Sequence, residues 1–228
     1  MCIPCVGHPS ISPAEEASDR TGGEHPVISG LGSPIRVTSS AERGWSSMAR
    51  DRSNLVWIDL ETTGLNAARR VILEIASVVT DPDLNILGEG PLLVIHHADE
   101  VLEDLDPWCE KQHAFSGLID SSRASDISLR EAEQQTLTFL RKHTHRGTAP
   151  LCGNTISFDR RFLRRHMRDL HDHLSHRNID VSTISELAYR WYPGVMSKLD
   201  KEVDHRASAD IRASIEELRL YRQLVFRD

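Results

Sequence analysis

The sequence lacks a long apolar run, and this limits the kind of protein that it encodes. No stretch approaches the roughly 18 apolar residues of a membrane span, because the best candidate, VILEIASVV, carries Glu74. Cysteine is scarce, and the four cysteines have no spacing typical of a disulfide framework. The sequence therefore predicts a protein without a membrane span that works in a reducing compartment, and we expect the cytoplasm.

The sequence also has fewer positively charged residues than negatively charged ones. The chain has 27 Lys and Arg residues against 34 Asp and Glu residues, which gives a formal charge of −7. This balance argues against a protein that coats nucleic acid by charge alone. It leaves room for an enzyme that holds one short anionic substrate with a few local cations. Neither a complete GxGxxG nor a P-loop is present, so these two phosphate-binding loops are not predicted.

The first 50 residues differ in composition from the rest. They contain five of the ten prolines and six of the thirteen glycines, without sustained periodicity. We expect residues 1–50 to form a disordered extension and residues 51–228 to form one domain. The extension has neither the apolar core of a secretory signal nor the acid-poor composition of a transit peptide. An alternative hypothesis is that translation begins at Met48.

The remainder shows regular patterns of apolar residues. Three segments, 54–60, 69–81 and 85–97, predict an antiparallel meander, and shorter strands are expected at 149–154 and 178–183. Ser128 and Glu131 form a capping box at the start of one predicted helix. The expected helices are 106–119, 128–143, 155–170, 182–192 and 207–224. This order of elements predicts a single α/β domain.

Two carboxylates, Asp59 and Glu61, follow the first apolar strand. Alternate side chains of a strand project to one side of the sheet, so these like charges should lie together at an energetic cost. A divalent cation would remove that cost, because carboxylate oxygens are the ligands that Mg²⁺ prefers. Asp159, near the start of a helix, and Asp210, five residues after His205 in the last helix, could join them. Alone, each of these residues is more often an ordinary surface or capping residue.

Together with their flanking residues, these positions resemble the DEDDh family of 3′-to-5′ exonucleases and, within it, the oligoribonucleases. The matching runs are WIDLETTGL, CGN followed by DRRFL, DVST, and HRASADIR. The resemblance covers residues 54–228 and implies an RNase H-like fold with a five-stranded mixed sheet flanked by helices. It also implies two divalent ions, Mg²⁺ or Mn²⁺, held by four acids, with His205 as the general base. The four acids are Asp59, Glu61, Asp159 and Asp210.

The resemblance further implies a short single-stranded RNA substrate, especially a dinucleotide, cleaved to 5′-mononucleotides. Leu65 and Trp108 would stack on bases, and His113 would contact the substrate. Thr155, Arg177 and Ser182 match the residues that grip the 5′ phosphate. His176 stands where many relatives carry a tyrosine that reaches across a homodimer, which puts this contact in doubt. The homodimer itself, and the mitochondrion as another possible location, are implied by the family.

Two other functions stay open at this point. One is a DEDDh exonuclease for longer substrates, such as a DNA proofreading subunit, although the DVST segment argues against an open groove. The other is a metal-binding or RNA-binding module without catalysis, although all five expected site residues are intact. The histidine-rich stretch 166–176 matches no closed zinc motif, and we expect a polar helix face there.

Overall fold

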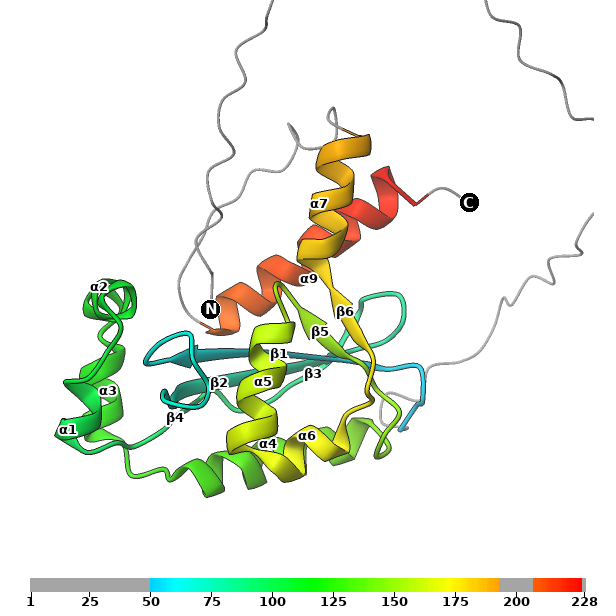
Figure 1. Ribbon diagram of the computed structural model, residues 1–228. Helices are drawn as coiled ribbons and strands as arrows, with labels where there is room; N and C mark the ends of the chain where they lie inside the picture. Colours follow the sequence, from blue (N-terminus) through cyan, green and yellow to red (C-terminus); the bar gives the residue numbers. More distant parts are fainter. Residues whose placement is uncertain (1–49, 193–206, 227–228) are drawn as a thin grey trace, which may run out of the picture. The chain divides into compact units, whose positions relative to one another are not determined.

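The computed structural model describes residues 50–192 and 207–226, and a mixed sheet lies at their centre (Figure 1). β1 (Leu55–Thr62) pairs antiparallel with β2 (Ile72–Thr80), which pairs antiparallel with both β3 (Ile86–Glu89) and β4 (Leu93–Val94). On its other edge β1 pairs parallel with β5 (Leu151–Gly153), and β5 pairs parallel with β6 (Asn178–Asp180). The expected meander and mixed sheet are confirmed. Residues 1–49 of the expected extension, including Met48, lie outside the described residues, as does His205.

The sheet has six strands instead of the expected five, because the third segment is interrupted. β3 pairs with the last residues of β2, whereas β4 pairs with Glu74 and Ile75 nearer its start. Between them Gly90 still donates its N–H to Ser77 O at 2.8 Å, but Pro91 has no N–H to continue the ladder. The two short strands therefore share the edge of β2 where one strand was expected.

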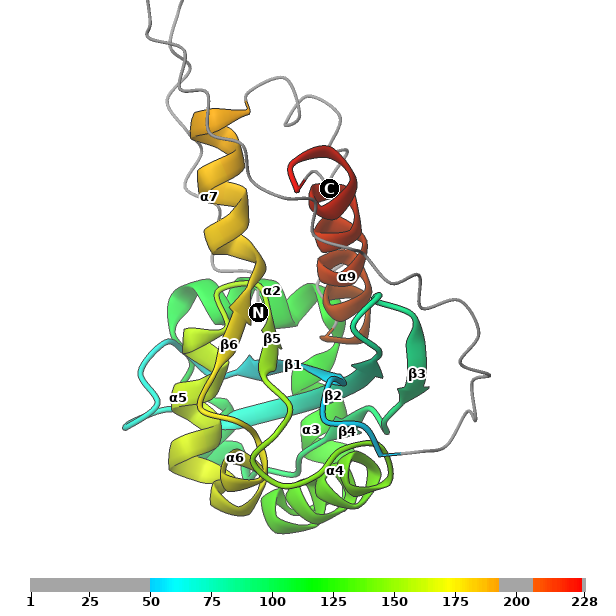
Figure 2. The ribbon, with the colours of Figure 1, turned by 90° about the vertical axis from the view of Figure 1, so that its right-hand side faces the viewer.

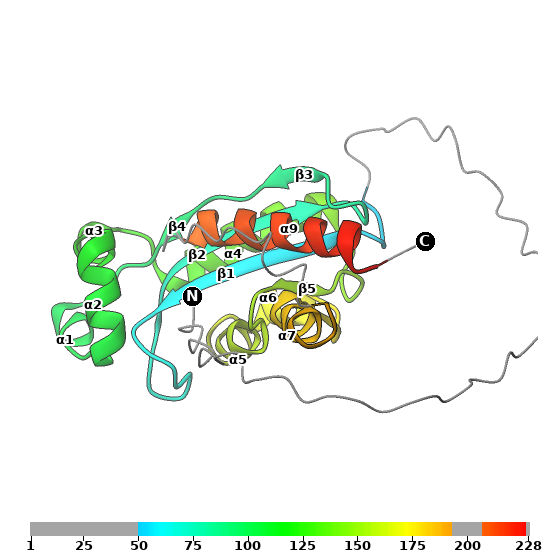
Figure 3. The ribbon, with the colours of Figure 1, turned by 90° about the horizontal axis from the view of Figure 1, so that it is seen from above.

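The two faces of β1 are covered by different helices, as Figures 2 and 3 show. Val56, Ile58 and Leu60 pack into a core with α4 (Leu129–His143), α5 (Ser157–His166) and α6 (Arg168–His173). Trp57 points to the other face, where it packs with α7 (Val181–Trp191) and α9 (Ala207–Leu224). Its indole N–H donates to Thr80 Oγ1 at 3.1 Å, so this buried polar atom is satisfied. Both faces are thus closed by helices along the apolar part of the strand.

Local signals explain where the helices begin and end. α4 has the expected capping box of Ser128 and Glu131, and α9 has the expected bounds. The helix expected at 106–119 is divided into α2 (Pro107–Ser116) and α3 (Leu118–Ala124) by Gly117, whose φ of 66° is unfavourable for other residues. The segment 155–170 is likewise divided into α5 and α6 at Met167, which has a non-helical φ of −130°. A short helix, α1 (Asp99–Leu102), was not expected.

Among the helices of the described residues, none combines the length and the apolar composition that a membrane crossing requires.

Candidate active site

Three carboxylates converge where β1 passes beneath the first turn of α9. Asp59 and Glu61 follow Trp57 at alternate positions of β1, so they share its face and point towards α9. Asp210 lies in the first turn of that helix. One carboxylate oxygen of each residue lies within 4.8 Å of those of the other two. The strand and the helix, separated by about 150 residues, therefore build an acidic cluster as the sequence predicted.

The acidic cluster is electrostatically unfavourable by itself. Burial raises the pKa of Glu61 to about 8, and the neighbouring charges of Asp59, Asp210 and Glu74 add to this rise. Glu74 is completely buried on β2, directly opposite Glu61, and its Oε1 accepts from the backbone N–H of Ala207 at 3.4 Å. Such a set of hard oxygen donors fits a divalent cation such as Mg²⁺ or Mn²⁺, whose charge would offset the repulsion.

Asp159 lies beside this cluster and not within the group of three. Its Oδ1 accepts from the backbone N–H of Leu60, between the two acids of β1, at 3.2 Å. The residue is 2% exposed, and burial together with the charge of Asp59 raises its pKa well above the usual value. The first turn of α5 thus brings the fourth expected acid against β1. The fifth expected residue, His205, belongs to the undescribed segment.

The residues expected to contact bases gather around the end of β1. Leu65 follows the strand and is 50% exposed. Trp108, in the first turn of α2, is partly buried against the core. His113 is buried, with Nε2 at 2.9 Å from Thr62 O, and burial lowers its pKa. Leu65 therefore follows Glu61 by four residues, and His113 lies against the last residue of β1, while the expected contacts of these side chains with substrate stay predictions.

Two of the residues expected at the 5′ phosphate meet in a polar network. The backbone N–H of Thr155, which has a φ of 49°, donates to Ser182 Oγ at 2.9 Å and to Asp180 Oδ1 at 3.1 Å. Ser182 Oγ donates to Asn154 Oδ1 at 2.9 Å, and Asn154 Nδ2 donates to Ser214 Oγ of α9 at 2.9 Å. Asn154 was not singled out by sequence reasoning, although it belongs to the CGN turn.

Arg177 and His176 lie elsewhere. Both are exposed and precede β6, so they are at the opposite end of this strand from Ser182. The backbone oxygen of Arg177 accepts from Arg160 of α5 at 2.9 Å, which fastens this end of the strand. Thr155 and Ser182 are therefore brought together, and the contact of Arg177 with the 5′ phosphate stays a prediction.

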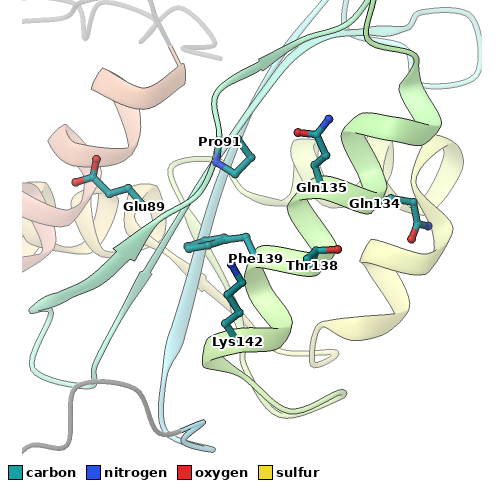
Figure 4. Close-up of a pocket in the computed structure, with 7 residues that line it drawn as sticks. All are labelled: Glu89, Pro91, Gln134, Gln135, Thr138, Phe139 and Lys142. Atoms are coloured by element: carbon teal, nitrogen blue, oxygen red, sulfur yellow. The ribbon is translucent and has the colours of Figure 1, made fainter.

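A hollow of about 480 Å³ lies away from these residues, between the β3–β4 connection and the outer side of α4 (Figure 4). None of the expected site residues lines it. Its walls are formed by Glu89, Pro91, Gln134, Gln135, Thr138, Phe139 and Lys142.

Comparison with known proteins agrees with this geometry. A family model described as an exonuclease of the RNase T type matches residues 56–218. The oligoribonuclease of Shewanella loihica is 51% identical over 180 residues, which are 79% of this chain and 99% of the relative. The chain belongs to the oligoribonuclease family of exonucleases. The oligoribonuclease of Haemophilus influenzae, 49% identical over 176 residues, covers 77% of this chain and 97% of its own.

Solved structures confirm the fold expected of an oligoribonuclease family member. The zinc-bound complex of Escherichia coli exonuclease I with single-stranded DNA superposes with a TM-score of 0.62 over 78% of this chain. This chain spans 42% of the exonuclease I chain, and the two sequences are 18% identical. At this level of identity the likeness confirms the RNase H-like exonuclease fold.

Proposed function

We propose that this chain is a metal-dependent 3′-to-5′ exoribonuclease that degrades short oligoribonucleotides, especially dinucleotides, to 5′-mononucleotides. The observation that carries this proposal is the acidic cluster of Asp59, Glu61 and Asp210, whose oxygens lie within 4.8 Å of one another. A cluster kept at this electrostatic cost is typical of a metal site in a nuclease. Membership in a family of oligoribonucleases supports the choice of RNA as substrate.

The acidic cluster and Asp159 are the proposed metal ligands. Asp59, Glu61 and Asp210 would hold divalent ions, Mg²⁺ or Mn²⁺, and Asp159 would complete a site for two ions from the side of Leu60. Bound divalent ions supply an activated water and stabilise the leaving oxygen in phosphodiester hydrolysis. The protein keeps its ligands in place through β1 and the first turns of α5 and α9, which are held by the two cores.

We propose His205 as the general base. An imidazole titrates near neutral pH, so it can take a proton from the attacking water at physiological pH. His205 precedes Asp210, one of the proposed ligands, by five residues in the sequence. His205→Ala should abolish turnover while leaving substrate binding intact, and retained activity would remove this residue from the role.

The substrate would lie at the acidic cluster, between the residues proposed to contact bases and those proposed to contact the 5′ phosphate. We propose that Leu65 and Trp108 contact the bases and that His113, held against Thr62 O at 2.9 Å, contacts the substrate beside them. Stacking on apolar and aromatic groups tolerates any base, which suits an enzyme that clears every dinucleotide. Thr155 and Ser182 are the proposed contacts of the 5′ phosphate, because they present hydroxyl groups next to each other, 3.2 Å apart.

We extend the proposal to a homodimer in the cytoplasm. Arg177 is exposed before β6 and is a further proposed contact of the 5′ phosphate, and the neighbouring exposed His176 is the residue that would reach the site of a second copy. Cys109 and Cys152 are free and buried, which agrees with a reducing compartment. Sedimentation of the full chain tests the dimer, and cell fractionation distinguishes the cytoplasm from the mitochondrion.

A single assay tests the proposed activity. The full chain is incubated with 5′-labelled RNAs of two to about twenty nucleotides, with Mn²⁺ or with EDTA. We expect fast cleavage of the dinucleotide, slow cleavage of the longest RNA, and no cleavage in EDTA. Equal rates at all lengths would indicate an exonuclease for longer substrates instead. Binding without products would indicate a module without catalysis.

A further inference from the structure

A pair of side chains, Asp106 and Arg70, ties the loop after β1 to the start of α2. Asp106 Oδ2 accepts from the backbone N–H of Leu65 at 3.0 Å, and its own N–H donates to Thr63 O at 3.0 Å. Arg70 Nη2 donates to Asp106 Oδ1 at 2.5 Å. We call Asp106 and Arg70 the loop clasp. One carboxylate thus holds the backbone beside Leu65 and is itself held by a guanidinium.

The loop clasp is tightly fitted and only partly exposed to water. A Cβ added at Gly64 would lie 2.0 Å from Asp106 Oδ2, so only glycine leaves room for the carboxylate. The side chains of Arg70 and Asp106 are 17% and 33% exposed, and Arg70 Nη1 also lies 3.0 Å from Asp104 Oδ1. Partly buried, charge-assisted pairs with two donors hold their geometry better than isolated surface ion pairs.

The side chain of Asp106 does not cap α2, the helix that follows it. It occupies the N-cap position of α2, where an aspartate normally accepts from the first turn of the helix. Here its side chain makes no capping hydrogen bond, and both oxygens are engaged by Leu65 and Arg70. The side chain therefore stabilises the loop, and the helix begins with Pro107, which needs no partner for a backbone N–H.

The loop clasp lies beside the acidic cluster. Leu65 follows Glu61 by four residues and is 50% exposed, and Trp108 stands two residues after Asp106 in the first turn of α2. Farther along α2, His113 contacts Thr62 O at 2.9 Å and fixes the helix to the same loop. The exposed leucine and the indole are consequently joined through Asp106, and the leucine follows the β1 ligands directly in the chain.

We propose that Asp106, held by Arg70, is a positioning residue that fixes Leu65 relative to Trp108 and thereby gives the site its preference for very short RNA. This inference rests on the proposed function. A dinucleotide has only two bases, so each base contact is a large share of its binding. A longer strand has further phosphates and bases to contact the protein, so the loss of one positioned contact affects it less.

The test compares Asp106→Ala and Asp106→Asn with the unaltered protein and with Asp99→Asn. Asp99 is a matched control, because it pairs with Arg123 at 2.6 Å on exposed α1, outside the site. For each protein kcat and KM are measured with a dinucleotide and with an RNA of about twenty nucleotides. Mn²⁺ affinity is measured by calorimetry without substrate, and the melting temperature is measured by circular dichroism.

For Asp106→Ala we expect KM for the dinucleotide to rise about 5- to 150-fold, the range that loss of one stacked base produces. We expect kcat to change less than about threefold, and Mn²⁺ affinity to stay unchanged, because the acids are untouched. Asp106→Asn should give a smaller rise in KM, since the amide oxygen still accepts from Leu65 but the charge facing Arg70 is lost. The ratio of kcat/KM for the dinucleotide to kcat/KM for the longer RNA should fall most in Asp106→Ala and less in Asp106→Asn.

Two results would overturn the inference. One is an unchanged KM and length preference in both Asp106 variants. The other is a parallel loss of Mn²⁺ affinity and kcat at constant KM, which would show that Asp106 only supports the metal ligands. Failure of the unaltered protein to cleave either RNA with Mn²⁺ would overturn the proposed function instead, so the two failures are distinguishable.

Discussion

The two faces of β1 begin alike and end differently. On the face towards α4 and α5, Val56, Ile58 and Leu60 are all buried and all apolar. On the face towards α9, the apolar Trp57 is followed by Asp59 and Glu61. One strand therefore contributes Val56, Ile58 and Leu60 to one core, whereas its other face changes from the buried Trp57 to two residues of the candidate site.

The difference between the two faces of β1 separates residues that stabilise the fold from residues that serve the proposed chemistry. Burying apolar side chains lowers the free energy of the folded state, whereas gathering three carboxylates raises it. Because both faces belong to one strand, adjacent residues can be altered to separate the two contributions.

The largest effect is expected for Asp59→Asn. Activity should fall about 1000-fold, at the upper end of what removal of one preorganised electrostatic group costs. The metal-free variant should unfold at the same denaturant concentration as the unaltered protein or a higher one, because one like charge beside Glu61 is gone. Steady-state kinetics and urea denaturation in EDTA measure both. A strong loss of metal-free stability would contradict the division between the faces.

The neighbouring change, Ile58→Ala, should act on stability. Ile58 is 1% exposed in the core with α4 and α5, so the truncation should lower the free energy of unfolding by about 2–5 kcal/mol. Mn²⁺ affinity should change little, since no ligand is removed. Urea denaturation and calorimetry test this, with Ile58→Val as a milder control expected to cost about 0.5–1.5 kcal/mol. If the change lowered the free energy of Mn²⁺ binding more than the free energy of unfolding, it would contradict the assignment of Ile58 to stability alone.

Binding of a divalent ion should offset the repulsion among the carboxylates on the face of β1 towards α9. At a Mn²⁺ concentration 100 times the dissociation constant, the free energy of unfolding should rise by about 2.7 kcal/mol, because the ion binds the folded state. The gain should be lost in Asp59→Asn and retained in Ile58→Val. Thermal denaturation with and without Mn²⁺ makes the measurement. An equal gain in all three proteins would place the ion elsewhere.

The smallest effect is the change in the free energy of unfolding per pH unit that ionisation of Glu61 causes in the metal-free protein. Its pKa is raised from 4.5 to about 8 by burial and neighbouring acids, so between these values the folded state binds a proton that the unfolded state has lost. Stability should therefore decrease as pH rises, by about 1.4 kcal/mol per unit between pH 5.5 and 7.5. Glu61→Gln should reduce this slope in urea denaturation and leave the part due to the raised pKa of Asp159, whereas Glu110→Gln, at an exposed position of α2, should not reduce it. Equal slopes in all three proteins would show that Glu61 does not carry the effect.

Local signals in the sequence predicted much of the fold. The capping box set the start of α4, and the spacing of Ile211, Ile215 and Leu218 gave the bounds of α9. Alternation along a strand placed Asp59 and Glu61 together, and the apolar stripe of α9 placed Asp210 beside them. These inferences succeeded because each depends on residues close in sequence or on the period of a single element.

The errors came where one residue interrupts a pattern or where distant segments meet. Gly117 and Pro91 are recognised breakers, yet the surrounding apolar residues suggested continuous elements across both. The loop clasp was not foreseen, because Asp106 and Leu65 are 41 residues apart in sequence and neither belongs to a spaced motif.

The interruption at Gly90 and Pro91 has a consequence for self-association. At one edge of the described sheet lie the short strands β3 and β4, and at the other lies β6, three residues long. Fibrils grow when a long free edge offers an unbroken row of backbone donors and acceptors to another molecule. Here each row stops after a few residues, so the sheet offers a poor template for amyloid-like growth even in concentrated solution.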